Sequence, residues 1–373
     1  MGLAPNGSLV LRPAAGQQLM LAGVDFADFV QRLQRLETEI QVFGQPCALN
    51  TTLVSPQPGA NKWWGAVLAS NGKIYGMPYA APAVLILDPA TNAVDTSAMA
   101  GFGVTGSKWA GGVLAGNGKI YGIPYSFGAV LMVDPATNAT DATTMAGLGK
   151  QGQWLGGVLA PNGKIYGIPH GASAVLIVDP ATSTTDTTTI AGLTGTFKWA
   201  GGVLAANGKI YGVPSSAASV LIIDPATNTA DTTAIAGLST GLQWAGGAVA
   251  GNGKIYCMPR FAQAVLIVDP ATNTTDVTSM AGLGTQTNKW IDAVRAPSGK
   301  IYGIPFSGPA VLIVDPDTNT ADTTTLPVSA GNVTAQRWAS GVLAGNGVLY
   351  GLPLDAQPLL AVSRACGGRP TAL

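Results

Sequence analysis

Residues 108–149 read KWAGGVLAGNGKIYGIPYSFGAVLMVDPATNATDATTMAGLG, and this stretch decides the fold. The same pattern returns along the chain, and its tryptophan marks seven copies spaced 45 to 48 residues apart. These tryptophans are Trp63, Trp109, Trp154, Trp199, Trp244, Trp290 and Trp338. A repeat of this length is typical of proteins that assemble one small structural unit many times.

Each copy predicts four strands separated by turn residues. In the copy quoted above, the first strand ends at Asn117 and the glycine after it, a dipeptide that favours a tight hairpin with positive φ at both residues. The second strand ends at Pro124, which cannot donate to a sheet ladder. The third ends at Asp134, whose carboxylate can cap the backbone N–H groups of the following turn. The fourth strand is expected over the threonine-rich residues 140–145.

Four strands in a unit of this size predict the blade of a β-propeller. Helical repeats of similar length are excluded, because Gly or Pro falls in nearly every ten-residue window. The seventh copy has only three strands, but residues 48–53 resemble the missing fourth strand. The sequence therefore predicts an all-β fold, a seven-bladed β-propeller over 47–373 in which an N-terminal strand closes the last blade and protects its edge.

Composition agrees with this architecture and excludes other classes. The 373 residues include 50 Gly and 25 Pro, only 10% are charged, and 47% are apolar, which argues against a long-helix protein and against a disordered chain. A net charge of zero lacks the electrostatic footprint of a nucleic-acid binder. The apolar runs are too short to predict a transmembrane helix, and Arg12 and Pro13 interrupt any conventional secretory signal.

Residues 1–46 form a segment of a different kind. Residues 8–24 predict two short strands, and 25–43 change to a heptad spacing with Asp25 placed as a helix cap. The apolar heptad positions are Phe26, Phe29, Leu33, Leu36, Ile40 and Phe43. They predict a short coiled-coil helix that makes a homo-oligomer, most readily a trimer. The alternative is a single helix that packs its apolar stripe on the side of the propeller.

Two of the three cysteines flank the predicted closure of the ring. Cys47 begins the closing strand, and Cys366 lies in the turn that leads toward it, so the two are expected to face each other across one blade edge. They form either a disulfide or a pair of reduced neighbours. Cys257 replaces a glycine of the repeat, which indicates a small buried residue.

One position diverges in an otherwise monotonous repeat. It follows the proline that ends the second strand, and its occupants are Tyr79, Tyr125, His170, Ser215, Arg260, Phe306 and Leu354. Scaffold positions repeat whereas recognition positions diverge, so this face is the predicted binding surface, unless the differences are unselected drift. The predicted ligand-binding residues here suit stacking on sugar rings or on a protein loop. They are Tyr79, Tyr125, Phe127, His170, Arg260, Phe261 and Phe306.

A second set of candidates directly precedes the tryptophans. Its cationic members are Lys62, Lys108, Lys198, Lys289 and Arg337, with glutamine in the two remaining copies. If these side chains converge on the central channel, they can bind an anion such as a carboxylate or a phosphate. The alternative is that they hydrogen-bond the backbone carbonyls of the neighbouring blade.

Titratable groups outside the repeat are few. Twelve of the 19 acidic residues are aspartates that recur in six copies, as expected of structural positions, and His170 is the only histidine. Asp292, Asp317 and Asp355 stay unassigned, and no glycosidase-type carboxylate pair can be assembled from them. The sequence therefore predicts a protein that is not an enzyme and that uses no metal and no cofactor.

The repeat signature W-x-G-x-V-L, N-G-K-I-Y-G-x-P and V-L-I-x-D-P-x-T-N resembles kelch-like β-propeller repeats over residues 48–366. The first 40 or so residues resemble the collar and trimerisation pieces of phage and large-virus fibre or tail proteins. Together these resemblances imply a trimeric virion-surface protein whose propeller recognises a host receptor or surface glycan. The alternative is an extracellular lectin-like or scaffolding propeller without viral context, and an enzyme that uses the same face is the third interpretation.

Overall fold

The computed structural model describes residues 48–50, 59–104, 106–149, 152–328, 336–355 and 358–363, and four short strands before residue 26. The chain divides into two compact units, Met1–Pro46 and Cys47–Leu373. In the first unit, β1 (Gly2–Leu3) pairs with β2 (Leu9–Val10), and β3 (Met20–Leu21) pairs with β4 (Val24–Asp25), each antiparallel. The sequence predicted one pair of strands here. The heptad positions between Phe26 and Phe43 lie outside the described residues.

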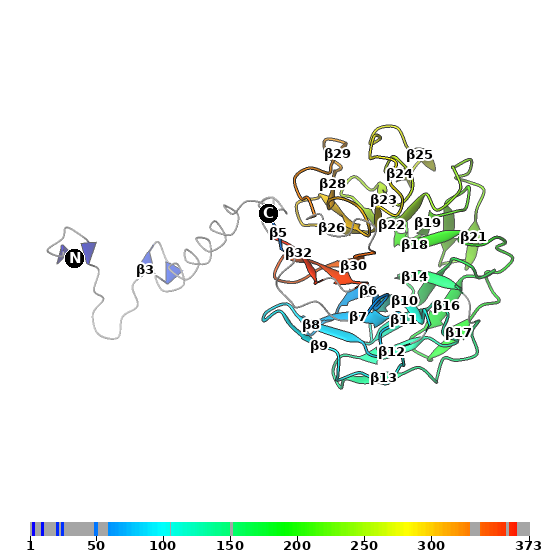
Figure 1. The fold of residues 1–373 in the computed structure, drawn as a ribbon, viewed down its shortest axis with the longest axis horizontal. Coiled ribbons are helices and arrows are strands. Elements are labelled where there is room, and N and C mark those ends of the chain that lie inside the picture. Colours follow the sequence, from blue (N-terminus) through cyan, green and yellow to red (C-terminus); the bar gives the residue numbers. More distant parts are fainter. Residues whose placement is uncertain are drawn as a thin grey trace. The chain divides into compact units, whose positions relative to one another are not determined.

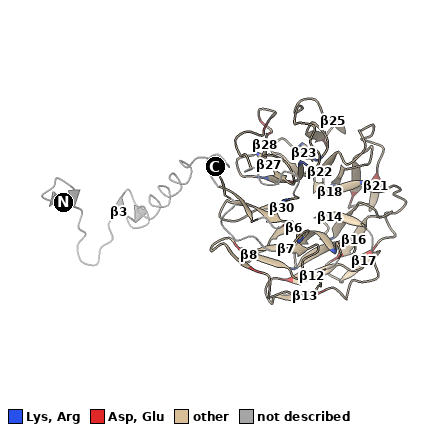
Figure 2. Cartoon of the chain, in the orientation of Figure 1, with Lys and Arg blue, Asp and Glu red and all other residues tan. Residues whose placement is uncertain are grey.

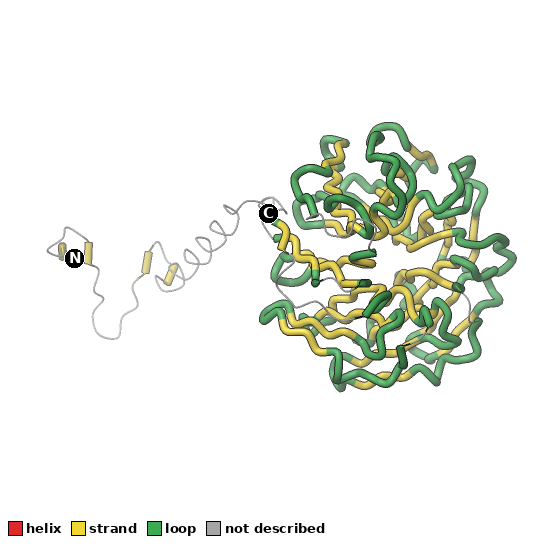
Figure 3. The backbone as a smooth tube through the Cα atoms, viewed as in Figure 1, coloured by secondary structure: helices red, strands yellow, loops and turns green. Residues whose placement is uncertain are grey.

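The second unit is a seven-bladed, all-β propeller, which confirms the predicted fold class. Six blades contain four antiparallel strands that are adjacent in the order of the sequence, as in β10-β11-β12-β13. Figure 1 shows the seven sheets arranged around one axis, with the red strands β30 and β32 of the last blade beside the blue strands of the first. Throughout the described residues Figure 3 shows strands and loops only.

The strands follow the predicted punctuation of the repeat. The innermost strands are β6 (Trp63–Leu68), β10 (Trp109–Leu114), β14 (Trp154–Leu159), β18 (Trp199–Leu204), β22 (Trp244–Val249), β26 (Trp290–Arg295) and β30 (Trp338–Leu343). The second strands are β7 (Ile74–Pro78), β11 (Ile120–Pro124), β15 (Ile165–Pro169), β19 (Ile210–Pro214), β23 (Ile255–Pro259), β27 (Ile301–Pro305) and β31 (Leu349–Pro353). The third strands are β8 (Leu85–Asp88), β12 (Leu131–Asp134), β16 (Leu176–Asp179), β20 (Leu221–Asp224), β24 (Leu266–Asp269), β28 (Leu312–Asp315) and β32 (Leu360–Val362). The outermost strands are β9 (Ala93–Asp95), β13 (Ala139–Asp141), β17 (Thr184–Asp186), β21 (Thr229–Asp231), β25 (Thr274–Asp276), β29 (Thr320–Asp322) and β5 (Leu49–Asn50).

The N-terminal strand closes the last blade, as predicted. Strand β5 pairs antiparallel with β32, so that Leu49 lies opposite Val362. Two further hydrogen bonds extend the pairing: the Ser363 N–H donates to the Ala48 carbonyl at 2.9 Å, and the Ala48 N–H donates to Ser363 Oγ at 3.1 Å. The blade that ends the chain therefore has four strands, and its third strand is covered by a fourth, as in the other blades.

The hairpin after the first strand differs from the predicted turn. In the second blade, the Gly118 N–H donates to the Ala115 carbonyl at 3.0 Å, and the Ala115 N–H donates to the Lys119 carbonyl at 2.9 Å. Only the glycine has positive φ, at 78°, and Asn117 does not. This is a three-residue loop, a tight turn followed by a left-handed glycine. The asparagine contributes through its side chain, because Asn117 Oδ1 accepts the Lys119 N–H at 3.1 Å.

The aspartates of the repeat act as turn caps. Asp134 Oδ1 accepts the Ala136 N–H at 2.9 Å, as predicted for the Asp-Pro turn. The fourth strand was predicted over 140–145, and its predicted end is wrong because β13 ends at Asp141. Asp141 Oδ1 accepts the N–H groups of Thr143 at 2.7 Å and Thr144 at 3.1 Å. A side-chain acceptor that captures two successive backbone donors turns the chain and ends the strand.

The hydrophobic core lies between neighbouring blades. One cluster joins Tyr75 and Met77 of the first blade to Trp109, Ile120 and Leu131 of the second, all nearly or fully buried. Each repeat tryptophan also donates its indole N–H to a backbone carbonyl 20 residues later, at 2.8–2.9 Å. Since buried indole N–H groups need an acceptor, this bond fixes the tryptophan at the same place in every copy.

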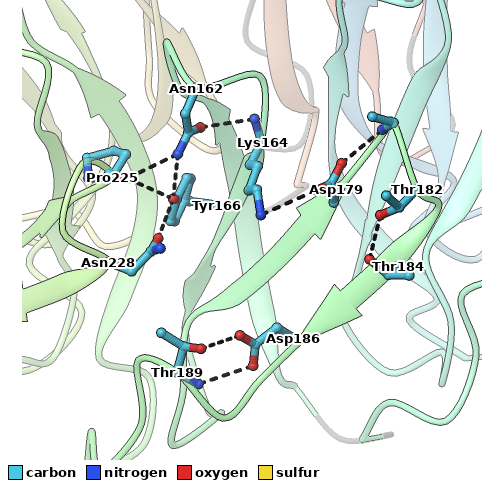
Figure 4. A network of polar contacts seen from close by, with 11 residues as sticks. Asn162, Lys164, Tyr166, Asp179, Thr182, Thr184, Asp186, Thr189, Pro225 and Asn228 are labelled. Atoms are coloured by element: carbon cyan, nitrogen blue, oxygen red, sulfur yellow. Dashed lines mark hydrogen bonds and ion pairs between the residues drawn. The ribbon is translucent and has the colours of Figure 1, made fainter.

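Polar residues tie the outer parts of the blades together, as Figure 4 shows for the third and fourth blades. Asn162 Nδ2 donates to the hydroxyl of Tyr166 at 3.0 Å, and this hydroxyl donates to Asn228 Oδ1 of the next blade at 2.7 Å. Lys164 forms an ion pair with Asp179 at 3.3 Å within its own blade. Figure 2 shows how sparse such charges are, with the acidic residues toward the rim of the ring.

Candidate ligand-binding face

The divergent position of the repeat leads to a cavity of about 210 Å³ at one end of the central axis. Five of the predicted residues line it: Tyr79, Tyr125, His170, Arg260 and Phe306. The rest of its lining consists of Asn61, Trp64, Leu155, Phe197, Leu242 and Gln336. We call this space the face cavity. At this volume it suits a single ring better than a drug-sized ligand, whose sites measure roughly 300–1,000 Å³.

The backbone of each blade fixes the divergent residue of the blade before it. The residue in front of each repeat tryptophan donates its N–H to the carbonyl of the preceding divergent residue, at 2.7–2.9 Å. The seven pairs are Lys62 with Leu354, Lys108 with Tyr79, Gln153 with Tyr125, Lys198 with His170, Gln243 with Ser215, Lys289 with Arg260 and Arg337 with Phe306. These bonds form a closed circle, so the side chains around the face cavity project from a rigid frame.

Aromatic rings form an unbroken arc around the cavity. The ring centroids of Trp64 lie 5.9 Å from Phe306 and 5.3 Å from Tyr79. The arc continues from Tyr79 to Tyr125 at 5.7 Å, from Tyr125 to His170 at 6.0 Å, and from His170 to Phe197 at 5.2 Å. These tilted and edge-on contacts are the favoured geometries of aromatic pairs. Six rings, two of them from the first blade and four from later parts of the chain, thus present a wall on which a cyclic ligand can stack.

His170 is a neutral acceptor in this wall. Its Nδ1 lies 2.9 Å from the carbonyl of Trp199, and only the protonated nitrogen can donate to that oxygen. Nε2 therefore carries the lone pair. Burial lowers the pKa of His170 to about 4, the bond to Trp199 opposes this shift, and the charges of Arg260 and Lys198 add to it.

Arg260 completes the circle opposite the arc. Its Nε donates to Asn288 Oδ1 at 2.8 Å, and its guanidinium carbon lies 5.7 Å from the centroid of Phe261. Arg260 lines both the face cavity and the axial channel beneath it. Burial lowers the pKa of its guanidinium, and electrostatic interaction with Tyr125 and Tyr79 opposes this.

Two predicted residues lie beside the cavity rather than in its lining. Phe127 packs on Trp109 with ring centroids 4.4 Å apart and joins the core between the first two blades. Phe261 lies under the guanidinium of Arg260 and supports it. Both residues act on the face cavity only through their neighbours.

The cations that precede the tryptophans do not line the face cavity. Lys198 Nζ donates to the carbonyls of Ala172 and Gly195, both at 2.8 Å, and Lys289 Nζ does the same with Ala262 at 2.9 Å and Gln286 at 2.8 Å. Lys62, Lys108 and Arg337 likewise donate to backbone carbonyls of the blade loops. All five are at most 4% exposed. This is the arrangement of the alternative interpretation, in which the cations hold neighbouring blades together.

The predictions for the three cysteines have different outcomes. Cys47 and Cys366, the predicted disulfide partners, lie outside the described residues. Cys257 is a free, buried thiol in β23, and burial raises its pKa. Its place against the core agrees with the small buried residue that the sequence indicated.

The axial channel below the cavity holds an acid that the sequence left unassigned. Glycines surround the axis because a Cβ on Gly65 would lie 2.6 Å from the Cα of Gly111. In the sixth blade Asp292 takes the place of this glycine on the wall of a channel of about 170 Å³. Its carboxylate accepts the N–H groups of Ala293 at 2.9 Å and Gly341 at 3.0 Å. Burial raises the pKa of Asp292 to about 6, and these hydrogen bonds oppose the shift.

Four apolar residues of the cavity were missed from the sequence. Trp64 and Leu155 each follow a repeat tryptophan, at a position that is alanine in four other copies. Phe197 and Leu242 lie two residues before a tryptophan and have left-handed backbones, with φ of 53° and 58°. Asparagine or glycine suits such a backbone, and Asn61, Gly152 and Asn288 have it at the equivalent positions. Comparison of the seven copies at these positions would have indicated all four residues.

Comparisons with known proteins show which fold the chain shares with them, and they identify no family. No protein-family profile matches the chain, and no curated protein matches it in sequence. Among solved structures, virginiamycin B lyase from Staphylococcus aureus aligns with a TM-score of 0.68 at 7% identity, over 85% of this chain and 99% of that one. A streptogramin B lyase aligns with a TM-score of 0.68 at 12% identity, over 85% and 98%. An extracellular domain described as part of a one-component system of B. thetaiotaomicron aligns with a TM-score of 0.60 at 10% identity, over 85% and 42%.

These findings correct two expectations from the sequence. The prediction that the chain is not an enzyme is contradicted, because the propellers it resembles include lyases, which are enzymes. The prediction rested on the scarcity of titratable groups along the sequence, whereas the propeller brings His170, Arg260 and two tyrosines from different blades into one cavity. The kelch-like and fibre-collar resemblances find no support in the comparisons. At these identities the likeness shows a common fold, and the chain is a seven-bladed β-propeller.

Proposed function

We propose that the propeller is a recognition module whose face cavity binds a cyclic ligand, such as one sugar of a glycan on a cell or particle surface. The observation that carries this proposal is the convergence of divergent residues: the repeat keeps its scaffold in every blade but places six rings and one arginine around a single cavity. Aromatic faces provide contact area for a ring at little cost in conformational entropy.

Backbone strain at the rim supports a binding role. Phe197 is 51% exposed and keeps a left-handed backbone that disfavours a bulky side chain. A residue in such a conformation costs on the order of 1–3 kcal/mol, and its exposed ring recovers little by burial. Strained residues of this kind cluster at binding sites. In the fold, Phe197 contributes mainly a ring at the edge of the cavity, beside His170.

The setting of this module is part of the same proposal. We place it outside the cell, in line with the extracellular domains that share its fold. Separately, the described part of the chain contains no helix long and apolar enough to cross a membrane. A host glycan or receptor is the proposed partner. Residues 25–43 would gather several propellers, most readily three, so that weak single-site binding becomes strong.

The experiment is a glycan array followed by calorimetry on the best cyclic ligand, with wild type and Phe197→Asn. Asparagine suits the left-handed backbone, so this variant is expected to unfold at a slightly higher temperature and yet to bind about tenfold more weakly, because one ring contact is lost. Val277→Ala, at another exposed apolar residue, is the control and should change neither property. Unchanged affinity in Phe197→Asn, or no binding of any cyclic ligand, would contradict the proposal.

A further inference from the structure

The guanidinium of Arg260 is held in a fixed position at the floor of the face cavity. The bond from Nε to Asn288 Oδ1 and the contact with the ring of Phe261 restrain the planar group from two sides. Asn288 is itself fixed, since it has a left-handed backbone with φ of 57°, which asparagine tolerates. The two terminal nitrogens of Arg260 donate to no acceptor within the described residues, so a rigid pair of donors is left for a ligand.

The positive charge of Arg260 lacks a counter-ion among the described residues. The ion pairs among the described residues each join the lysine that precedes a blade's second strand to the aspartate that ends its third strand, and none includes Arg260: Lys73–Asp88, Lys164–Asp179, Lys209–Asp224, Lys254–Asp269 and Lys300–Asp315. Asp292, the acid of the axial channel, bonds the backbone of Ala293 and Gly341 instead. The ionisable groups of the cavity that interact electrostatically with Arg260 are Tyr79, Tyr125 and His170, and none of them is an acid.

A half-buried cation without a partner is costly, because burial removes water from the charge and no anion of the protein replaces it. An oxyanion of a ligand compensates for this loss. The guanidinium fork matches a carboxylate or a phosphate with two parallel hydrogen bonds, which is the strongest pairing available to an arginine. The rings of the aromatic arc line the same cavity as Arg260.

We infer that the ligand of the face cavity is a ring that bears an oxyanion, such as the carboxylate of a sugar acid, and that Arg260 binds this group while the arc of rings stacks on the remainder. This inference rests on the proposed function, because it specifies the ligand class of the same cavity. The charge also sets the orientation of the ligand, since the anionic edge must face the fifth blade, which carries Arg260.

The first experiment compares three ligands that differ at one carbon: methyl glucoside, methyl glucuronide and methyl glucoside 6-phosphate. Calorimetry uses wild type, Arg260→Met and the control Arg295→Met, which removes an exposed arginine of strand β26. Wild type and the control are expected to bind at least one of the acidic ligands about tenfold more tightly than the glucoside. In Arg260→Met we expect this preference to be lost. The acid that binds more tightly shows whether the site prefers a carboxylate or a phosphate.

The second experiment replaces the sugar with a benzene ring and compares benzoate with the neutral benzamide. Benzoate is expected to raise the melting temperature of wild type and of Arg295→Met more than benzamide does, and to lose this advantage in Arg260→Met. Equal shifts in wild type and Arg260→Met, or no preference for acids in wild type, would overturn the inference. If a neutral ring binds and Phe197→Asn weakens it while acids gain nothing, the proposed function stands and this inference fails. If the acids lose their advantage in Arg260→Met while Phe197→Asn binds them as tightly as wild type, the contact between Arg260 and the oxyanion holds and the proposed role of the aromatic rings fails.

Discussion

His170 and Asp292 lie at two levels of the same axis and titrate in opposite senses. His170 is 3% exposed, and its folded state resists protonation until about pH 4, whereas the folded state favours the protonated form of Asp292 up to about pH 6. Between these values an acidic pH removes the stability that depends on neutral His170 and adds stability through Asp292. A single melting curve of wild type mixes the two effects.

The variant His170→Asn separates them. Its amide can still donate to the Trp199 carbonyl but does not titrate. Because the unfolded histidine has a pKa near 6.5 and the folded one about 4, the stability that neutral His170 contributes is complete above pH 6.5 and is lost as the pH falls to 4. Urea unfolding at pH 7, 5.5 and 4 should show wild type losing about 3 kcal/mol more than the variant. Parallel losses in the two proteins would contradict this prediction.

At the scale of residues, the sequence predicted those cavity residues that stand out when the seven copies of the repeat are compared. Tyr79, Tyr125 and His170 were found because six other copies show what the scaffold requires at their position. Asp292 was missed because its role depends on distance from an axis that no single copy defines. For the cations that precede the tryptophans, the sequence left both a binding role and a structural role open. Only three-dimensional contacts show where such a side chain points.

At the scale of single elements, the shortest strand of the propeller completes its last blade. Strand β5 has two residues, yet it supplies the outer edge of the seventh blade. Leu49 packs against the core between the sixth and seventh blades, beside Val362. The sequence predicted this strand correctly, because the missing fourth segment of the last copy was found upstream. It misjudged the ends of the other outer strands, since their aspartates bond the backbone ahead of them.

Leu49→Ala tests the contribution of this strand. The matched control is Val94→Ala. Val94 lies in β9 at the same ladder position of the first blade, and there the chain connection to β8 holds the strand in place. Leu49→Ala is expected to speed hydrogen exchange of residues 360–363 by about tenfold, because a half-buried contact worth roughly 1–2 kcal/mol is removed. Val94→Ala should leave these amides unchanged. Equal exchange in both variants would mean that β5 does not secure the last blade.

For the whole molecule, the scarcity of charge follows from the way the blades pack. Each blade is buried on both faces against its neighbours, so most charged side chains lie at the turns and strand ends or are the cations in front of the tryptophans (Figure 2). Asp292 in β26 is an exception, on the wall of the axial channel. Those cations are tolerated inside because carbonyls of the adjoining loops accept their hydrogen bonds. Composition alone therefore indicated many tight turns, and the repeat showed how they are arranged.

The association predicted for 25–43 belongs to this scale. The full chain is expected to be trimeric in light scattering after size exclusion, and a chain that starts at Gln45 is expected to be monomeric, because the heptad apolar residues are removed. Leu33→Asp in the full chain should have the same effect as the truncation. A monomeric full chain would contradict the prediction and favour a heptad segment that packs within one molecule.

The closure of the ring by β5 has a mechanical consequence. A pull that reaches the propeller through residues 1–46 arrives first at Ala48, which bonds Ser363 at the end of β32. Because β5 pairs with β32 over only two residues, few hydrogen bonds bear such a load. The seam of the seventh blade is therefore expected to open at a lower force than the six blades whose four strands follow one another in the sequence, so it limits the load that the N-terminal connection can carry.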